Sequence, residues 1–322
     1  MQYRTLGTSD VRVSEISLGC WTLGGLNWVD GNPNGWADVD EAEAIRAINL
    51  AQDRGVNHFD NADVYGNGRA ERLLAKALGA RSGSAIIASK LGHFRGTAEH
   101  AYDPLHVRHQ CEQSLKNLRR EHIDIYYFHH GDFGPDDRYL PEALATMRAM
   151  QQEGKVRLIG LSAYSEADFL RLAPIIKPTV LQSSANALDD RFIRIGSPVR
   201  ALLESQRMSF VAFGPLAQGL LLDKFDPAKP PTFDEGDHRR GKSRFAQPEL
   251  ERLKPKLAKL KARFGETTSD LARVALQYLL HEPVVACTIP GFRNVRQVET
   301  NLSADAQPLT DDDARYVRAA LA

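Results

Sequence analysis

Four side chains of the types that transfer protons to a carbonyl group stand at the ends of short apolar runs. Asp60 ends the first of these runs, Tyr65 follows just before a glycine, and Lys90 and His129 end the next two runs. A tyrosine hydroxyl with a pKa near 10 is a weak acid at neutral pH, and a nearby ammonium lowers that pKa. Hydride delivery to a carbonyl carbon builds negative charge on oxygen and requires a proton there. These four residue types predict one role each. Tyr65 is the acid, and Lys90 lowers the pKa of Tyr65. Asp60 holds Lys90 charged and in place, and His129 orients the carbonyl.

Each of these residues also has an ordinary structural interpretation. Asp60 can cap the next helix and Tyr65 can be a half-buried aromatic residue. Lys90 can extend out of a strand end, and His129 can be a hydrogen-bonded core histidine. The pair His129-His130 raises the possibility of a metal site, but no third ligand stands at a helpful spacing, so we expect no metal. Their joint occurrence on successive strands is more specific than any single residue.

An alternation of apolar runs and helical patterns must position these side chains. A hairpin at 3–6 and 11–13 comes first. The predicted strands are 16–19, 58–60, 85–90, 123–129, 158–162, 180–184, 209–213 and 284–288, and the predicted helices are 40–54, 69–78, 104–118, 141–153, 166–175, 198–206, 248–264, 269–280 and 294–302. Parallel strands buried on both faces read as short continuous apolar runs, so the pattern predicts one (β/α)8 barrel over residues 1–322. A doubly wound sheet would normally carry G-x-G-x-x-G after an early strand, and none occurs.

In such a barrel, functional groups project from the carboxyl ends of the strands. The residues that end the predicted strands are mostly polar: Asp60, Lys90, His129, Ser162, Gln182, Phe213 and Thr288. This recurrence predicts one shared site at the mouth of the barrel. Trp21, Trp28, Trp36 and Phe133 fall in loops that should open at that mouth. We therefore expect an apolar or aromatic substrate wall, with Trp21, Trp28 and Phe133 as substrate contacts.

The segment 223–247 interrupts the alternation with prolines and charges, and it precedes an extra helix before the last βα unit. It contains Gly236-Asp-His-Arg-Arg-Gly-Lys-Ser243, which matches the P-loop pattern. A P-loop must follow a buried strand and open a helix, whereas Pro230 and Pro231 lie upstream here. We therefore reject a triphosphatase site and predict a mobile basic lid.

Composition limits the class of ligand. Lys and Arg together number 41, as do Asp and Glu, so no basic field favours nucleic acid or an anionic membrane. Cys20, Cys111 and Cys287 are odd in number and lack C-x-x-C spacing, which predicts reduced, buried thiols. No apolar targeting segment opens the chain. We expect a cytoplasmic protein that binds a small molecule, while the oligomeric state is not indicated.

Several independent motifs are similar to those of the aldo-keto reductase superfamily. They are Phe59-Asp-Asn-Ala-Asp-Val-Tyr-Gly66, Ala88-Ser-Lys90, Ile123-Asp-Ile-Tyr-Tyr-Phe-His129, Gly154-Lys-Val-Arg-Leu-Ile-Gly-Leu-Ser162, Gly214-Pro-Leu-Ala-Gln-Gly219 and Ile289-Pro-Gly-Phe-Arg293. The resemblance runs from about Tyr3 to Leu302. It implies a (β/α)8 oxidoreductase that uses a nicotinamide cofactor on aldehydes or ketones.

The resemblance also implies roles for individual residues. The catalytic tetrad would be Asp60, Tyr65, Lys90 and His129. The implied cofactor contacts are Ser162 and Gln182 for the carboxamide, Phe213 for the ring, Gly214, Leu216 and Gln218 in the following loop, and Gly291, Arg293, Gln297 and Asn301 for the adenosine phosphate. The chain departs from the common family pattern at Ala163, at Gly291-Phe292 and at Thr300.

We expect NADPH rather than NADH as the cofactor. Arg293 directly precedes a predicted helix, whose free N–H groups and dipole favour an anion. Gly291 lets the backbone approach, and a guanidinium can bind the 2′-phosphate in a fork. Arg239, Arg240 and Lys242 of the lid can add charge.

Two other classes remain open at this stage. A cofactor-binding protein with slow turnover, similar to potassium-channel β-subunits, would keep the barrel and the cofactor. An isomerase or lyase on the same barrel would bind no nicotinamide.

Overall fold

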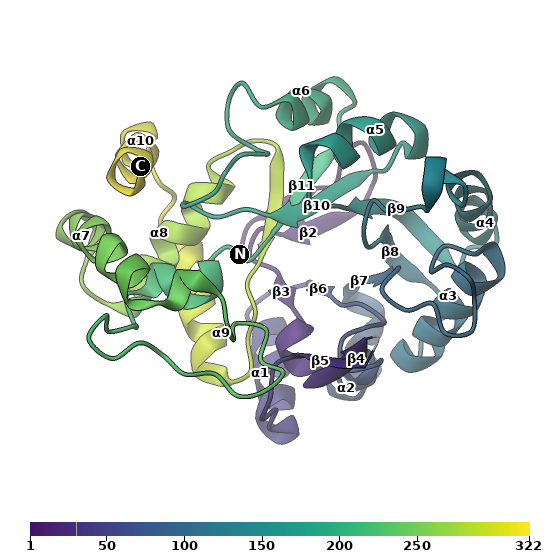
Figure 1. Cartoon of the computed structure of the whole chain (residues 1–322), viewed down its shortest axis with the longest axis horizontal. Helices are drawn as coiled ribbons and strands as arrows, with labels where there is room; N and C mark the ends of the chain where they lie inside the picture. The colour runs from purple at the N-terminus through teal and green to yellow at the C-terminus, as the bar shows by residue number, and fades with distance from the viewer. Residues whose placement is uncertain (30) are drawn as a thin grey trace.

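The computed structural model describes residues 1–29 and 31–322. Its main sheet has eight parallel strands in the order β12-β11-β10-β9-β8-β7-β6-β3. Their bounds are β3 (Leu18–Gly19), β6 (His58–Asp60), β7 (Ile86–Leu91), β8 (Ile123–Phe128), β9 (Val156–Ser162), β10 (Val180–Ser184), β11 (Ser209–Phe213) and β12 (Val285–Ile289). Parallel bridges between Ile16 and Thr288 and between Gly19 and Gly291 bring the two edges together. The predicted barrel is therefore confirmed as a nearly closed one (Figure 1).

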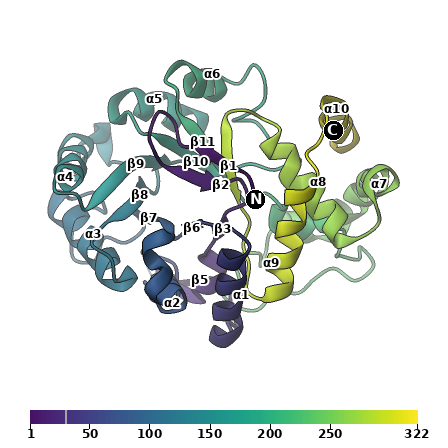
Figure 2. The same ribbon diagram turned by 180° about the vertical axis from the view of Figure 1, so that it is seen from behind.

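Helices surround the sheet on its outer side (Figures 1 and 2). They are α1 (Glu41–Asp53), α2 (Arg69–Leu78), α3 (Pro104–Leu118), α4 (Leu140–Gln152), α5 (Glu166–Ile176), α6 (Pro198–Ser205), α7 (Gln247–Phe264), α8 (Thr268–Leu280), α9 (Val295–Leu302) and α10 (Asp311–Leu321). Short 3-10 turns are η1 (Trp21–Leu23), η2 (Gly79–Ser84), η3 (Pro135–Asp137), η4 (Ala217–Leu222), η5 (Ser243–Phe245) and η6 (Ser303–Ala306). Side-chain caps fix where the helices begin. Asp103 accepts hydrogen bonds at the start of α3, and Thr267 forms a capping box with Asp270 at the start of α8.

The N-terminal hairpin, β1 (Tyr3–Thr5) with β2 (Arg12–Ser14), closes the amino end of the barrel. Leu6, Val11 and Val13 are buried against strand residues such as Ile125 and Val211. This end is therefore sealed by apolar packing, and the opposite end is left for polar side chains.

Two elements were not expected from the sequence. A second hairpin, β4 (Leu26–Val29) with β5 (Asn32–Gly35), lies in the loop after β3. Its asparagines, glycines and proline lack the alternation of a strand, and Gly35 forms a bridge with Asp237 of a distant segment. The last helix, α10, was also missed. The capping box of Thr310 with Asp313 was the available signal.

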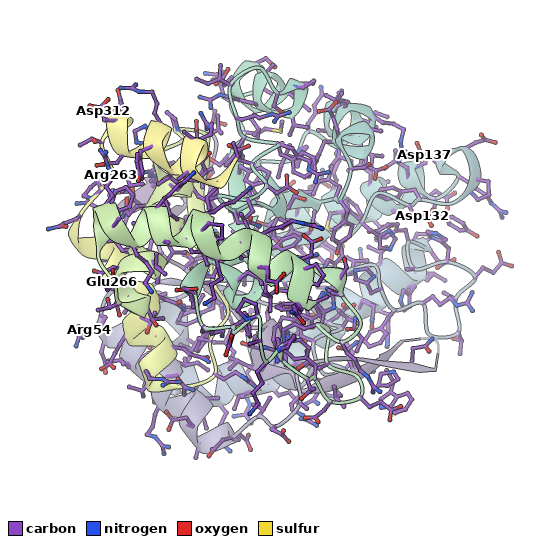
Figure 3. All side chains as sticks on the ribbon, turned by 60° about the vertical axis from the view of Figure 1, so that its left-hand side comes forward. Arg54, Asp132, Asp137, Arg263, Glu266 and Asp312 are labelled. Carbon is purple, nitrogen blue, oxygen red and sulfur yellow. The ribbon has the colours of Figure 1, made fainter. Side chains whose placement is uncertain are left out.

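The helix α10 packs beside α7 (Figure 3). Arg263 of α7 bonds the Asp313 carboxylate at 2.8 Å, and the Tyr316 hydroxyl donates to the Lys259 carbonyl at 3.0 Å. Among the described helices, none is long and apolar enough to cross a membrane. The three cysteines are buried and unpaired, as predicted.

Candidate active site

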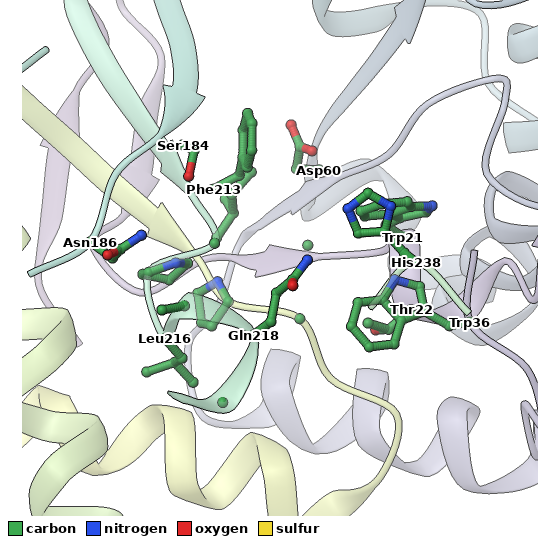
Figure 4. Close-up of a pocket in the computed structure, with 18 of the residues that line it drawn as sticks. Trp21, Thr22, Trp36, Asp60, Ser184, Asn186, Phe213, Leu216, Gln218 and His238 are labelled. Carbon is green, nitrogen blue, oxygen red and sulfur yellow. The ribbon is translucent and has the colours of Figure 1, made fainter. Parts of the chain in front are cut away.

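A cavity of about 990 Å³ opens at the carboxyl ends of the strands. Figure 4 shows part of its lining, with Asp60 facing Phe213 and Ser184 on one side and Trp21, His238 and Trp36 on the other. The predicted site residues in its lining are Trp21, Asp60, Tyr65, His129, Ser162, Gln182, Phe213, Gly214, Leu216, Gln218, Gly291, Arg293, Gln297 and Asn301. Residues from seven strands or the loops that follow them thus meet in one space.

Lys90 lies directly behind this lining and is 1% exposed. Its ammonium donates to the Asp60 carboxylate, to the Asn61 carbonyl at 2.7 Å and to the Tyr65 hydroxyl at 3.2 Å. Asp60 also accepts a hydrogen bond of 2.7 Å from the Gln182 amide. A buried ion pair is costly unless further hydrogen bonds satisfy both charges, and here they do. The arrangement fixes the lysine so that it points at the tyrosine oxygen.

A tight turn after β6 places Tyr65. Gly66 has a φ of 59°, and a Cβ built on it would lie 1.9 Å from the Gly24 carbonyl oxygen. A Cβ on Gly24 would lie 2.6 Å from the Tyr65 carbonyl carbon. Only glycines allow this approach, so η1 and the Tyr65 turn are held against each other. Trp21 of η1 stacks on the Tyr65 ring with centroids 5.9 Å apart.

The pKa of Tyr65 is raised well above its ordinary value, first by burial and then by the charges of Asp60, Cys20 and Asp63. The net shift is upward, so the lowering expected from Lys90 does not set the direction of the Tyr65 pKa in this structure. The hydroxyl stays protonated at neutral pH. This is the state of a proton donor, while the reverse reaction would have to remove that proton at greater cost.

His129 follows β8 and is 5% exposed. Burial, then the charges of His93, Lys90 and His130, lowers the pKa of His129 well below its ordinary value. Its ring lies 6.1 Å from the Tyr65 ring, and its Nδ1 has no partner in the described protein. A neutral imidazole beside the tyrosine can hydrogen-bond a carbonyl oxygen there.

Ser162 and Phe213 form the opposite wall. The Ser162 hydroxyl is buried and has no hydrogen-bond partner among the described residues. Gln182, by contrast, already donates to Asp60, so its amide nitrogen serves the tetrad in this structure. After Gly214 the chain turns through positive φ at Ala217 (47°), Gln218 (58°) and Gly219 (93°), which keeps this loop against the cavity.

The lining of the cavity also carries a group of positive charges. Five cations line it: Lys224, Arg239, Arg244, Arg293 and Arg296. Of these only Arg239 has a carboxylate partner among the described residues, Asp237 at 2.7 Å. Asp60 is the single carboxylate in the described lining. Burial, and then the charges of Arg239, Arg293 and Arg296, lower the pKa of Lys224.

Two helix N-termini add to these positive charges. The first residues of α8, Thr268 and Ser269, line the cavity, and so do Arg296 and Gln297 in the first turn of α9. Among the described residues, the Arg293 guanidinium donates only to the Ala37 carbonyl, at 3.1 Å. Burial and then the Arg239 charge lower the pKa of Arg293. An anion between these groups would relieve the repulsion, and free N–H groups at helix starts favour one.

Two predicted substrate contacts lie elsewhere. Phe133 is fully buried, stacked on Tyr102 at 4.3 Å and edge-on to Phe128 at 5.3 Å, so it is a core residue. Trp28 is 60% exposed on β4 and is absent from the cavity lining. The expectation failed because loop aromatic residues carry no sequence signal that separates core, surface and pocket.

Several lining residues were not predicted from the sequence. His93 and Tyr164 lie three and two residues beyond Lys90 and Ser162, in the loops after β7 and β9. A search of the residues just past each strand end would have found them. Asn27 and Asn34 also line the cavity, but they stand on the unexpected hairpin and had no such signal.

The segment 223–247 lies along the cavity, as a lid would. His238 contacts Trp21 with ring centroids 4.4 Å apart, and Arg239 covers the Trp36 ring at 4.6 Å. In the described chain, no strand leads directly into the P-loop pattern and the short turn η5 follows it, so the pattern forms no phosphate cradle. Mobility of this segment stays a prediction. Among the described residues, no three His, Cys, Asp or Glu side chains gather to hold a metal.

Comparison with known proteins agrees with this geometry. The model of the aldo/keto reductase family matches residues 15–322. The holo form of aldo-keto reductase AKR11C1 from Bacillus halodurans superimposes with a TM-score of 0.78 at 26% identity, covering 99% of this chain and 96% of that one. L-galactose dehydrogenase of Arabidopsis thaliana is 26% identical over 94% of this chain and 88% of its own. A probable voltage-gated potassium channel subunit beta of the same plant is 27% identical over 96% and 93%. The chain belongs to the aldo/keto reductase family of oxidoreductases.

Proposed function

We propose that the protein reduces a small aldehyde or ketone to the alcohol with NADPH. One observation carries this proposal. A single cavity joins a protonated tyrosine, held by Lys90 and Asp60, to a cluster of cations at two helix N-termini. NADPH has the matching layout, with an uncharged carboxamide at the nicotinamide end, a pyrophosphate in the middle and a 2′-phosphate on the adenosine ribose.

The residues present fit the nicotinamide end. The unpartnered Ser162 hydroxyl is available to hydrogen-bond the carboxamide, and Phe213 offers a ring face beside it. Ala163 stands where the family usually has an asparagine, so Ser162 lacks a neighbouring side chain that would also hydrogen-bond the carboxamide. When bound, the cofactor supplies a hydride to the carbonyl carbon.

The protein supplies the proton and the orientation. The Tyr65 hydroxyl gives its proton to the carbonyl oxygen as negative charge develops there. Lys90 stabilises the phenolate left behind, and Asp60 keeps the ammonium in place. Neutral His129 hydrogen-bonds the same carbonyl oxygen and so fixes which face of the substrate meets the hydride.

The cations in the cavity lining support NADPH rather than NADH as the cofactor. Arg239 has a carboxylate partner, whereas Arg293, Arg296, Arg244 and Lys224 have none among the described residues, so these four are available to an anion. Arg293 stands at the start of α9, where Asn294 caps the helix and Gln297 is hydrogen-bonded to the Arg293 backbone. A 2′-phosphate at this point would meet both a guanidinium and a helix N-terminus.

The similarity to the plant channel subunit supports the alternative of a slow-turnover regulator. The similarity to L-galactose dehydrogenase supports an enzyme. The complete tetrad favours catalysis. Three buried free cysteines support action in a reducing compartment such as the cytoplasm.

The test is oxidation of NADPH in the presence of 4-nitrobenzaldehyde, followed by absorbance. We expect steady turnover in the wild type. Tyr65→Phe should lower kcat by about 10²–10⁴, the range for loss of a general acid, with the Kd for NADPH nearly unchanged. Quenching of tryptophan fluorescence measures that Kd. Near-full turnover by Tyr65→Phe would refute the role of Tyr65, and binding without turnover in the wild type would favour a regulator.

A further inference from the structure

One hydrogen bond crosses the mouth of the barrel. The Gln182 amide of β10 donates to the Asp60 carboxylate of β6 at 2.7 Å. In the main sheet, β9, β8 and β7 stand between these two strands. Figure 4 shows Asp60 facing Phe213 and Ser184, which end β11 and β10. The bond therefore joins the side of the cavity that carries Tyr65 to the opposite side.

Both partners of this bond are buried. Gln182 is 1% exposed and Asp60 is 2% exposed. An ionised carboxylate only accepts hydrogen bonds, so the nitrogen of the amide and not its oxygen must face Asp60. Hydrogen bonds to charged groups are stronger than neutral ones, and a buried charged oxygen left without a donor is costly. The contact is therefore one that the folded chain keeps.

The two carboxylate oxygens of Asp60 have different partners. Oδ1 accepts from the Lys90 ammonium, and Oδ2 accepts from Gln182. The same ammonium lies 3.2 Å from the Tyr65 hydroxyl. A chain of hydrogen bonds thus runs from Gln182 through Asp60 and Lys90 to the proton donor. Because Asp60 is held at both oxygens, its carboxylate cannot turn, and the direction in which Lys90 points is fixed.

We propose that Gln182 is a positioning residue, which holds Asp60 and so keeps the Lys90 ammonium against the Tyr65 oxygen. The family resemblance implies a different role for Gln182, contact with the cofactor carboxamide. Its amide nitrogen is already bonded to Asp60, whereas the Ser162 hydroxyl beside it on β9 has no partner among the described residues. This inference rests on the proposed function, because it concerns the step in which Tyr65 gives up its proton.

Gln182→Met removes the donor with little change in side-chain size. The readout is the rate of 4-nitrobenzaldehyde reduction in single turnovers with NADPH, so that cofactor release does not limit it. We expect a loss of about 10-fold, the low end for a hydrogen bond to a charged group, because the effect reaches Tyr65 only through two other side chains. The Kd for NADPH, from tryptophan fluorescence, should stay nearly the same, which also shows that the variant is folded.

Two further variants frame this result. Ser162 pairs in register with Gln182 and is equally buried, so Ser162→Ala should raise the Kd for NADPH where Gln182→Met does not. Gln113→Met makes the same change at an exposed position of α3 outside the cavity lining. It should alter neither the rate nor the Kd.

Gln182→Glu separates positioning from packing. The change keeps the shape of the side chain but sets a second carboxyl group against Asp60, and two carboxylates in contact raise the pKa of one of them. At high pH the rate should fall at least as far as in Gln182→Met. As the pH drops, the new carboxyl group takes up a proton and donates to Asp60 as the amide does, so most of the loss should be recovered. The ratio of the two variants cancels the titration of Asp60, Lys90 and Tyr65, which both proteins keep.

Three results would overturn the proposal. A full rate in Gln182→Met would remove the positioning role. A raised Kd for NADPH with a full rate would assign Gln182 to the carboxamide, and a rate of Gln182→Glu that does not recover at low pH would leave only a packing role. In each case the reductase function stands. No reduction of any aldehyde by the wild type would remove the proposed function and this role together.

Discussion

Lys90 shows how single atoms set the chemistry of the site. Three oxygens from Asp60, Asn61 and Tyr65 surround its ammonium, and Gln182 occupies the second oxygen of Asp60. The lysine has no freedom to turn away from the tyrosine. Burial sets the upward direction of the Tyr65 pKa, and the ammonium 3.2 Å from the hydroxyl favours the phenolate that forms when the proton leaves.

Arg293→Ala tests cofactor choice at the same scale. Removal of a guanidinium that binds a 2′-phosphate should weaken NADPH by about 10–150-fold, the equivalent of roughly 1.5–3 kcal/mol for a charge-assisted contact. NADH, which lacks that phosphate, should bind almost as before. Fluorescence titration with both cofactors gives the two Kd values, and Arg191→Ala at an exposed arginine outside the cavity is the control. Equal losses for both cofactors would contradict the assignment.

His58 offers a test by pH. It is fully buried below the tetrad, and burial is the main cause that lowers its pKa to about 4. The unfolded chain, with a pKa near 6.5, binds the proton more readily, so stability is present above that value and falls as pH drops toward 4. Between pH 7 and pH 5 this one group should cost about 2 kcal/mol.

Urea unfolding of the wild type and of His58→Gln at both pH values checks this. The variant should lose about 2 kcal/mol less than the wild type over the same interval. Identical pH dependence in the two proteins would show that His58 is not the group responsible.

At the scale of elements, the site depends on contacts between loops that follow different strands. The turn that carries Tyr65 rests on η1 through Gly24 and Gly66, and the β4–β5 hairpin rests on the lid through the bridge between Gly35 and Asp237. Each loop is short or irregular and has little structure of its own. Their mutual packing therefore decides where the aromatic wall lies.

Gly24→Ala tests the first of these contacts. Gly24 has φ −72° and ψ −26°, so alanine suits the backbone, but its Cβ would meet the Tyr65 backbone at 2.6 Å. We expect kcat to fall by roughly 10–10² through displacement of the hydroxyl, and stability to fall by about 1–3 kcal/mol. Steady-state kinetics and urea unfolding measure both. Gly83→Ala, with no atom within 4 Å of the new Cβ, should change neither.

At the scale of the whole molecule, the two ends of the barrel have different tasks. The N-terminal hairpin seals one end with apolar side chains, and the polar strand ends converge at the other. Fourteen of the predicted site residues reach one cavity because the sheet is parallel and nearly closed. The whole chain is proposed to form this single domain.

Limited proteolysis tests that proposal. The first cuts should fall within 223–247, where prolines and charges replace regular structure, and saturating NADPH should slow them if this segment covers the cofactor. Gel electrophoresis and mass spectrometry locate the cuts. A clean division near residue 150 into two stable halves would refute a single barrel.

The sequence alone determined the barrel, because eight short apolar runs separated by helical patterns leave few other folds. It also placed the tetrad, since parallel strands bring their carboxyl ends together and polar residues stand there. Only the tertiary structure decided the pKa of Tyr65, which depends on burial by residues far apart in the chain. Only the tertiary structure shows that Phe133 lies in the core, that Trp28 is exposed, and that Asn27 and Trp36 line the cavity. Loop positions follow from contacts between distant segments, and no local periodicity encodes those contacts.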